Sequence, residues 1–236
     1  MKSISCIVYS KHLVTFFLIT VLLLNGCQRN VSLPETVDAH YIKYKIKYLE
    51  DRAGDIPTRI LPGHMDAFYT KHFVLSRIEG FFNQFSLIQI ADLRHKRVTT
   101  LLNFFGNKVY TVGKHGELPA AMVKPDDIKC KFTGETSIIG GLNSERVEVD
   151  TGKEQYNIYY TKDFTVRRPN ISTPYRSIDY PLSEFRVQLS LLKMLLSCAE
   201  FETKTIESHI FTIPEEYRLV SKGEMEEIIN SLFTKE

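Results

Sequence analysis

A strictly alternating segment at residues 41–48, Tyr-Ile-Lys-Tyr-Lys-Ile-Lys-Tyr, constrains the fold of this 236-residue chain more than any other feature. Successive side chains of a β-strand point to opposite faces of the sheet. One face of the segment would therefore carry Ile42, Tyr44, Ile46 and Tyr48. The opposite face would carry Lys43, Lys45 and Lys47. The pattern predicts a half-buried antiparallel strand whose outer face is covered by lysine.

Short runs rich in β-branched and aromatic residues follow, separated by turn signals such as Asp92–Lys96, Gly140–Gly141 and Thr151–Gly152. Strands at such close spacing indicate an antiparallel meander, and Lys193–Met194 is interpreted as a further turn. The Pro-containing segments 51–62 and 163–178 are expected to be loops. The expected strands are Ala67–Tyr69, His72–Ile78, Phe81–Ala91, Val98–Phe104, Val109–Val112, Lys129–Phe132, Thr136–Ile139, Arg146–Val149, Tyr156–Tyr160, Glu184–Leu192, Leu195–Lys204 and Phe211–Tyr217.

A short helix is predicted at the C-terminus. Ser221 and Glu224 have the spacing of a capping box, in which a hydroxyl and a carboxylate satisfy free amides of the first turn. Met225, Ile228, Ile229 and Leu232 would then share one face. The fold class that follows is mainly β, with a curved antiparallel sheet or incomplete β-barrel and a short C-terminal helix.

The N-terminal segment has the features of a secretory signal peptide. Lys2 and Lys11 precede the uncharged run Leu13–Leu24. At ~1.5 Å per residue in a helix, this run is too short to cross a hydrocarbon core of ~30 Å. A basic start, a short apolar run and small residues after it are typical of a signal peptide, here residues 1–26.

The sequence Leu24-Asn25-Gly26-Cys27 resembles the bacterial lipobox. That resemblance implies cleavage between Gly26 and Cys27, with acyl chains such as palmitate attached to Cys27 as a lasting membrane anchor. Residues 27–39 are interpreted as the lipidated N-terminus and its tether, and residues 40–236 as a single β-rich domain. Gln28 after the cysteine favours the cell outer membrane as the location, with the domain either facing the periplasm or exposed at the surface.

The charge balance argues against a nucleic-acid partner. The leader contains only two of the 30 basic side chains, so 28 basic and 28 acidic side chains remain after cleavage. A neutral domain offers no broad basic surface. The local basic run Arg94-His95-Lys96-Arg97 and the lysines near residue 45 could meet phospholipid headgroups, or could be a solvated turn and strand face.

No motif in the sequence indicates an enzyme, a metal site or a cofactor. The seven histidines form no HxH or HExxH pair, and the chain contains no CxxC, no P-loop and no GxSxG sequence. Cys130 and Cys198 would be either a disulfide or two unpaired thiols. The sequon Asn170-Ile-Ser172 is interpreted as accidental.

Several short motifs resemble a family of uncharacterised bacterial envelope lipoproteins found in Bacteroidota. They are Thr133–Gly141, Glu154–Asp163, Pro169–Asn170, Phe211–Pro214 and Ser221–Glu226, with Asp92, Lys96 and Thr99–Leu102 in the earlier half. This family is distantly similar to the periplasmic lipoprotein carriers LolA and LolB. The resemblance implies an incomplete antiparallel β-barrel whose inner face can hold acyl chains or apolar segments. The chain lacks the long N-terminal helix of LolA and, like LolB, would keep its own lipid.

Two functions remain open from the sequence. The first is a non-enzymatic, membrane-anchored module that binds a lipid, a lipoprotein acyl chain or another apolar ligand, and no ligand residue is assigned. The alternative is a scaffold lipoprotein that recruits envelope proteins through loops 51–62 and 163–178. An open apolar cavity would favour the first, and apolar residues exposed on those loops would favour the second.

Overall fold

The computed structural model describes residues 34–80 and 84–233, and the compact unit that carries the sheet begins at Glu35. The expected signal peptide, with the cleavage residue Gly26 and the lipidation residue Cys27, lies outside the described residues. In the part of the chain that the structure describes, no helix is long and apolar enough to cross a membrane.

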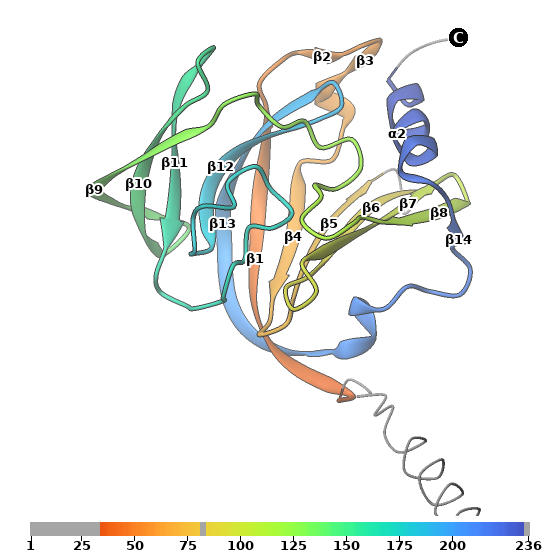
Figure 1. Cartoon of the computed structure of the whole chain (residues 1–236), viewed down its shortest axis with the longest axis horizontal. Coiled ribbons are helices and arrows are strands. Elements are labelled where there is room, and N and C mark those ends of the chain that lie inside the picture. The colour runs from red at the N-terminus through yellow and green to blue at the C-terminus, as the bar shows by residue number, and fades with distance from the viewer. Residues whose placement is uncertain (1–33, 81–83, 234–236) are drawn as a thin grey trace, which may run out of the picture. The chain divides into compact units, whose positions relative to one another are not determined.

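The described residues form one open sheet of twelve strands, in the order β14-β8-β7-β6-β5-β4-β1-β13-β12-β11-β10-β9, with one short C-terminal helix (Figure 1). All neighbouring strands are antiparallel except β14 and β8, which run parallel. This confirms the predicted mainly β class. The strands of the sheet are β1 (Thr36–Tyr48), β4 (His64–Tyr69), β5 (Phe73–Gly80), β6 (Phe85–Asp92), β7 (Arg97–Phe104), β8 (Asn107–Val112), β9 (Lys129–Ile139), β10 (Leu142–Asp150), β11 (Gln155–Thr161), β12 (Leu182–Leu189), β13 (Leu192–Glu207) and β14 (Arg218–Leu219). The small elements are β2 (Arg52–Ala53), β3 (Ile56–Pro57), the 3₁₀ helices η1 (Thr58–Ile60) and η2 (Ser208–Phe211), and the helix α2 (Lys222–Ser231).

The alternating segment is the centre of the sheet. β1 pairs with β13 on one side and with β4 on the other, and its inward side chains Ile42, Tyr44 and Ile46 are buried while Lys45 and Lys47 are exposed. The strand begins at Thr36, so the last residues of the expected 27–39 tether belong to the sheet. Ala39 is buried in a cluster on the outer face, which gives this stretch a packing reason to be ordered.

Two wings extend from the centre. The β4–β8 wing and the β9–β13 wing are both antiparallel meanders, and side chains from both form one large core cluster that includes Leu102, Val109, Val147 and Ile158. Long connections between β8 and β9 and between β11 and β12 cross the space between the wings (Figure 1).

The chain after β13 wraps the β4–β8 wing. η2 packs on the outer face, where the rings of Phe211 and Phe73 stack with centroids 5.3 Å apart. β14 then adds to the edge of β8, and α2 returns to the inner face. The predicted strand Phe211–Tyr217 is therefore wrong: Phe211 ends a 3₁₀ turn, and Pro214 has no N–H for a sheet ladder.

Two other boundaries differ from the sequence prediction. The turn between β12 and β13 is Ser190–Leu191 and not Lys193–Met194, because Leu189 pairs with Leu192 and Ser190 adopts a positive φ of 51°. The expected strands Lys129–Phe132 and Thr136–Ile139 form the single strand β9. Residues 133–135, with Gly134 at a φ of 74°, bulge opposite Arg146 without ending the pairing.

Candidate functional site

An apolar cavity of about 240 Å³ lies between the inner faces of the two wings and helix α2. None of the side chains that line it carries a formal charge. They come from elements that are far apart in sequence and comprise Tyr48, Ile56, Leu61, Pro62, Ile78, Phe85, Leu87, Leu102, Phe104, Phe105, Leu189, Leu192, Met194, Ile229, Leu232 and Phe233. Such a lining suits a ligand group with no charge and little polarity.

Strand register builds one wall of this cavity. Ile78 of β5 pairs with Leu87 of β6, which pairs with Leu102 of β7. Directly opposed residues of antiparallel neighbours lie on the same face, so the three side chains form one apolar row. Each is inward because of the two-residue period of its strand.

Helix α2 and the C-terminal turn close another side of the cavity. The Ser221 hydroxyl accepts a hydrogen bond from the Glu224 amide at 3.1 Å, which confirms the predicted helix start. Met225 and Ile229 are buried against the wing. The Phe233 carbonyl accepts from the Asp55 amide at 3.1 Å, which ties the end of this segment to the β2–β3 hairpin.

The cavity opens to solvent beside the β7–β8 turn. Phe105 lines the cavity yet remains 64% exposed, and it packs edge-to-face on Phe104 with ring centroids 4.8 Å apart. Tyr48, also in the lining, donates its hydroxyl proton to the Pro62 carbonyl at 2.7 Å. Burial raises the pKa of Tyr48, so the phenol stays neutral.

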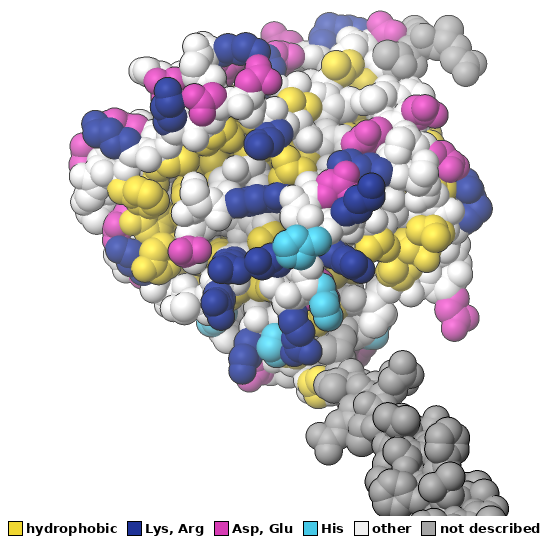
Figure 2. Space-filling model, viewed as in Figure 1, with side chains coloured by type: hydrophobic (Ala, Val, Ile, Leu, Met, Phe, Trp, Pro, Cys, Tyr) yellow, Lys and Arg dark blue, Asp and Glu magenta, His cyan; other side chains and the backbone are white. Residues whose placement is uncertain are grey.

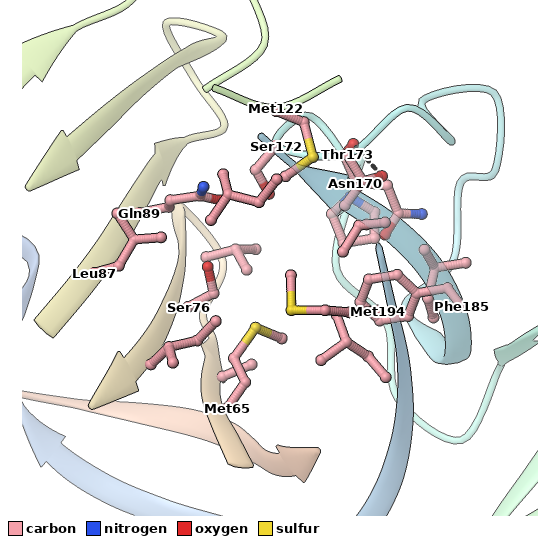
Figure 3. A pocket seen from close by; sticks show the side chains of 18 of the residues that line it. Met65, Ser76, Leu87, Gln89, Met122, Asn170, Ser172, Thr173, Phe185 and Met194 are labelled. Atoms are coloured by element: carbon pink, nitrogen blue, oxygen red, sulfur yellow. Dashed lines mark hydrogen bonds between the residues drawn. The ribbon is translucent and has the colours of Figure 1, made fainter. Parts of the chain in front are cut away.

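A smaller cavity of about 60 Å³ adjoins the first and shares Ile78, Leu87, Leu189 and Met194 with it (Figure 3). Met65, Met122 and Met194 come from three separate segments and converge on this space. Methionine is unbranched and polarisable, so it fills irregular space and rearranges at low cost. Of the three, only Met194 lines both cavities.

Two polar side chains point into the smaller cavity from paired positions. Ser76 of β5 lies opposite Gln89 of β6, and both line the space (Figure 3). Gln89 is only 8% exposed, and within the described residues its side-chain amide makes no hydrogen bond. Its amide atoms are not among the fully buried polar atoms that lack a partner, so they face open space. Gln89 is therefore available to a neutral donor or acceptor such as an ester, an amide or a hydroxyl.

Asn170, on the opposite wall, is a structural residue. It is 4% exposed, and its amide nitrogen donates to the carbonyls of Ile178 at 2.7 Å and Tyr180 at 2.8 Å. These bonds brace the connection between β11 and β12 internally. The asparagine of the sequon is thus buried and hydrogen-bonded inside the fold.

The titratable residues singled out in the sequence do not converge. No group of three His, Cys, Asp or Glu side chains among the described residues could hold a metal ion. His40 packs on Phe164 with ring centroids 4.5 Å apart, and burial lowers its pKa. His95 instead contacts Asp92 at 2.6 Å within the β6–β7 turn.

The two described cysteines are free thiols. Cys130 lies near the start of β9, whereas Cys198 packs against Gly140, just past the end of that strand. Ten residues of extended chain span ~30 Å, and a disulfide needs Cα atoms within ~7 Å. The unpaired alternative is the one the structure contains. Burial raises the pKa of Cys198 to about 11.

No protein-family model matches the chain, and no curated protein matches it in sequence. Two solved structures of a protein called PNGF-II, in space groups C2 and P21, match with TM-scores of 0.53 and 0.54 and sequence identities of 13% and 14%. The chain has the fold of part of PNGF-II. The matches cover 83% and 82% of this chain, but the chain spans only about a third (33%) of each PNGF-II molecule. At this identity the likeness concerns the fold alone.

Sequence reasoning assigned no residue to the cavity, although the family resemblance implied an apolar inner face. A weak signal was present, because Met65, Met122 and Met194 are three of only five methionines in the chain. Their convergence depends on the pairing of β1 with both β4 and β13, and local patterns carry no information on that pairing.

Proposed function

We propose that the chain is a non-enzymatic, membrane-anchored envelope lipoprotein that binds a lipid or another apolar ligand between the two wings of its sheet. In this proposal, residues 1–26 are removed and lipid on Cys27 holds the domain on the bacterial outer membrane. The ligand would place an apolar chain in the larger cavity and an uncharged polar group beside Gln89.

The charge-free cavity of about 240 Å³ is the observation that carries the proposal. An aliphatic cavity of ~150 Å³ is large enough to bind benzene, so this space admits a longer apolar group such as a segment of an acyl chain. The adjoining methionine-lined space would extend it. This arrangement also fits the acyl-holding inner face that the resemblance to LolA and LolB implies.

The scaffold alternative finds less support in the loops. The 163–178 loop packs its large apolar side chains into the core and leaves few of them exposed to a partner. The buried ones are Phe164, Val166, Tyr175 and Ile178. The 51–62 loop exposes Ile60, which is 55% accessible. A single exposed isoleucine is ordinary for a protein surface.

Mass spectrometry of the lipoprotein purified from its native membrane in mild detergent tests both parts of the proposal. We expect acyl chains on Cys27 and a co-purifying lipid. An unmodified Cys27 would refute the anchor, and the absence of any bound small molecule would argue for the scaffold.

A binding assay with N-phenyl-1-naphthylamine, a neutral apolar fluorophore, tests the cavity directly. The chain contains no Trp, so indole fluorescence does not interfere. Ile78→Phe adds a ring inside both cavities and should weaken probe binding at least ~10-fold, because the added volume has no other place to go. Ile88→Phe, half-buried on the opposite face of the neighbouring strand, is the matched control. Equal binding by both variants would place the probe elsewhere and refute the cavity as the site.

A further inference from the structure

Four connections meet at one end of the domain, where β4, β6, β8 and β11 finish. Backbone hydrogen bonds join them in sequence: the Leu93 amide donates to the His72 carbonyl at 2.9 Å, and the Gly116 amide donates to the Lys96 carbonyl at 2.8 Å. The Arg176 guanidinium then donates to the Gly116 carbonyl. The β4–β5 turn, the β6–β7 turn, the loop after β8 and the 163–178 loop therefore form one continuous surface.

This surface, here called the basic end, is rich in positive charge. Its exposed cations are Lys71, Arg94, Arg97, Lys114, Arg167 and Arg168. Within the described residues none of the six forms a salt bridge with a carboxylate. Figure 2 shows Lys, Arg and His side chains gathered over these turns. Because they come from four connections, the charge is assembled by the fold and extends beyond the Arg94–Arg97 run seen in the sequence.

Three acidic side chains near these connections are engaged locally, while Asp179 in the β11–β12 connection and Glu35 and Asp38 at the start of the sheet are exposed at the same end. Asp92 is held by His95 and by the amides of the β6–β7 turn. Glu117 pairs with Lys222 at 2.9 Å, and Asp163 accepts hydrogen bonds from Asn143.

Cations on the rest of the domain are paired far more often. Lys193 lies 2.8 Å from Glu50, Lys131 lies 3.0 Å from Glu148, and Arg146 lies 2.6 Å from Glu135. The six unpaired cations outnumber the exposed acidic side chains Glu35, Asp38 and Asp179 at this end, so the end carries a local excess of positive charge in a chain that is neutral without its leader. It points to an anionic partner at that end.

The start of the folded chain also lies at the basic end. His40 pairs with Tyr69, the last residue of β4, and β1 extends four residues beyond His40 to Thr36 (Figure 1). Cys27 and Thr36 are nine positions apart in the chain, and an extended chain covers ~3.3 Å per position. A lipid anchor on Cys27 would keep this end within ~30 Å of the bilayer surface.

From these observations we infer that the basic end is a docking surface for an anionic phospholipid bilayer. The contact orients the domain on the membrane that holds its anchor. Pro169 and Thr173 of the 163–178 loop line the smaller cavity, so docking places that cavity beside the bilayer, from which an apolar ligand would come. The inference uses the proposed anchor for its geometry, but its electrostatic part stands without lipid on Cys27.

A vesicle co-sedimentation assay with an unlipidated chain, residues 28–236, tests the electrostatic contact separately from the lipid anchor. Both core clusters lie between Ala39 and Phe233, so this chain contains the whole folded unit. We expect binding to vesicles of phosphatidylcholine with 30% phosphatidylglycerol, little binding to pure phosphatidylcholine, and release by 0.5 M NaCl. Each basic residue near an anionic surface changes partitioning by ~5-fold.

The triple variant Lys71→Gln/Arg94→Gln/Lys114→Gln, with one change in each of three connections, should therefore reduce partitioning by ~100-fold. The matched control Lys45→Gln/Lys47→Gln/Arg59→Gln removes three exposed cations elsewhere and should stay within a few-fold of the parent chain. Equal losses in the two variants, or binding that ignores phosphatidylglycerol, would overturn the inference. Either result would leave the cavity proposal standing, because that proposal is read out by the apolar probe.

Discussion

The two edges of the sheet are finished in different ways. Beyond β8, the parallel strand β14 satisfies the edge, with the Val220 amide donating to the Tyr110 carbonyl at 2.8 Å, and α2 packs nearby. β9, the other edge strand, pairs only with β10 among the described residues and exposes 53% of Phe132 and 69% of Ile138.

The open edge has its own protection. The bulge at residues 133–135 interrupts a regular row of hydrogen-bonding groups, and Lys129 and Lys131 place charge along the strand. Both devices hinder pairing with another chain. One edge of the sheet is thus sealed by the C-terminal segment that contains β14 and α2. The other edge is protected from further pairing by the bulge and by charged side chains. We expect stability to be concentrated on the sealed side.

The largest test of this difference compares a buried helix residue with an exposed edge residue. Met225 of α2 is fully buried against the β4–β8 wing. Met225→Ala should lower the free energy of unfolding by ~2–5 kcal/mol, because the change leaves a cavity. Ile138→Ala at the open edge should stay within ~0.5 kcal/mol. Urea unfolding measures both values, and similar losses would contradict the comparison.

A second test concerns the contact that holds the β9–β10 turn, at the open edge, against Cys198. Gly140 in the β9–β10 turn has a φ of 55°, and a Cβ there would lie 2.5 Å from both the carbonyl oxygen and the Sγ of Cys198. Gly140→Ala should therefore cost ~2–4 kcal/mol, from left-handed strain and overpacking together.

Gly141→Ala is the control for that turn. Its φ is 87°, but nothing lies within 4 Å of an added Cβ, so only the strain of ~1–2 kcal/mol remains. Thermal unfolding of both variants checks the order. If the two alanines cost the same, the turn is not held by its contact with Cys198.

A third test loosens the sealed side at the start of α2. Ser221→Ala removes the hydroxyl that accepts from the Glu224 amide and should cost ~1 kcal/mol. Ser231→Ala, at the exposed end of the same helix, removes a hydroxyl that donates to the Ile228 carbonyl and should cost less than ~0.5 kcal/mol. A chemical denaturation curve distinguishes them.

The smallest effect concerns pH. Burial alone would raise the pKa of Asp92, but hydrogen bonds from the His95 ring and from the amides of His95 and Arg94 outweigh it, so its pKa lies below the usual value. A carboxylate with a lowered folded pKa contributes stability above the unfolded pKa of ~4 and loses it as pH falls through the folded value.

Asp92→Asn should therefore cost up to ~1 kcal/mol at pH 7, and the difference from the parent chain should shrink below pH ~4. Asp150→Asn, in the exposed β10–β11 turn, should show a smaller effect because solvent screens the site. Unfolding curves from pH 3 to 7 measure this dependence, and a penalty that grows on acidification would contradict it.

Local patterns in the sequence were sufficient for much of the fold. The period-two alternation of β1 and the Ser221 cap appear where the residues predicted them, because both depend on neighbours within a few positions. The Ser190–Leu191 turn was missed because a serine with positive φ is rare. The residues that line the cavity, and the extent of the basic end beyond Arg94–Arg97, could not be predicted because each feature is assembled from segments that only the strand order brings together.

The pairing of β1 with β13 has a consequence for how the molecule folds. Lys43 and Glu200 are adjacent in the sheet but 157 residues apart in the chain. Contacts of such long range are slow to form, so the side of β1 that pairs with β13 stays open until nearly the whole chain has been made, although β4 can pair with the other side much earlier. A strand with an open edge and an apolar face is prone to aggregate. The lysines on its other face oppose aggregation during that period, a role that ends once β13 has paired with β1.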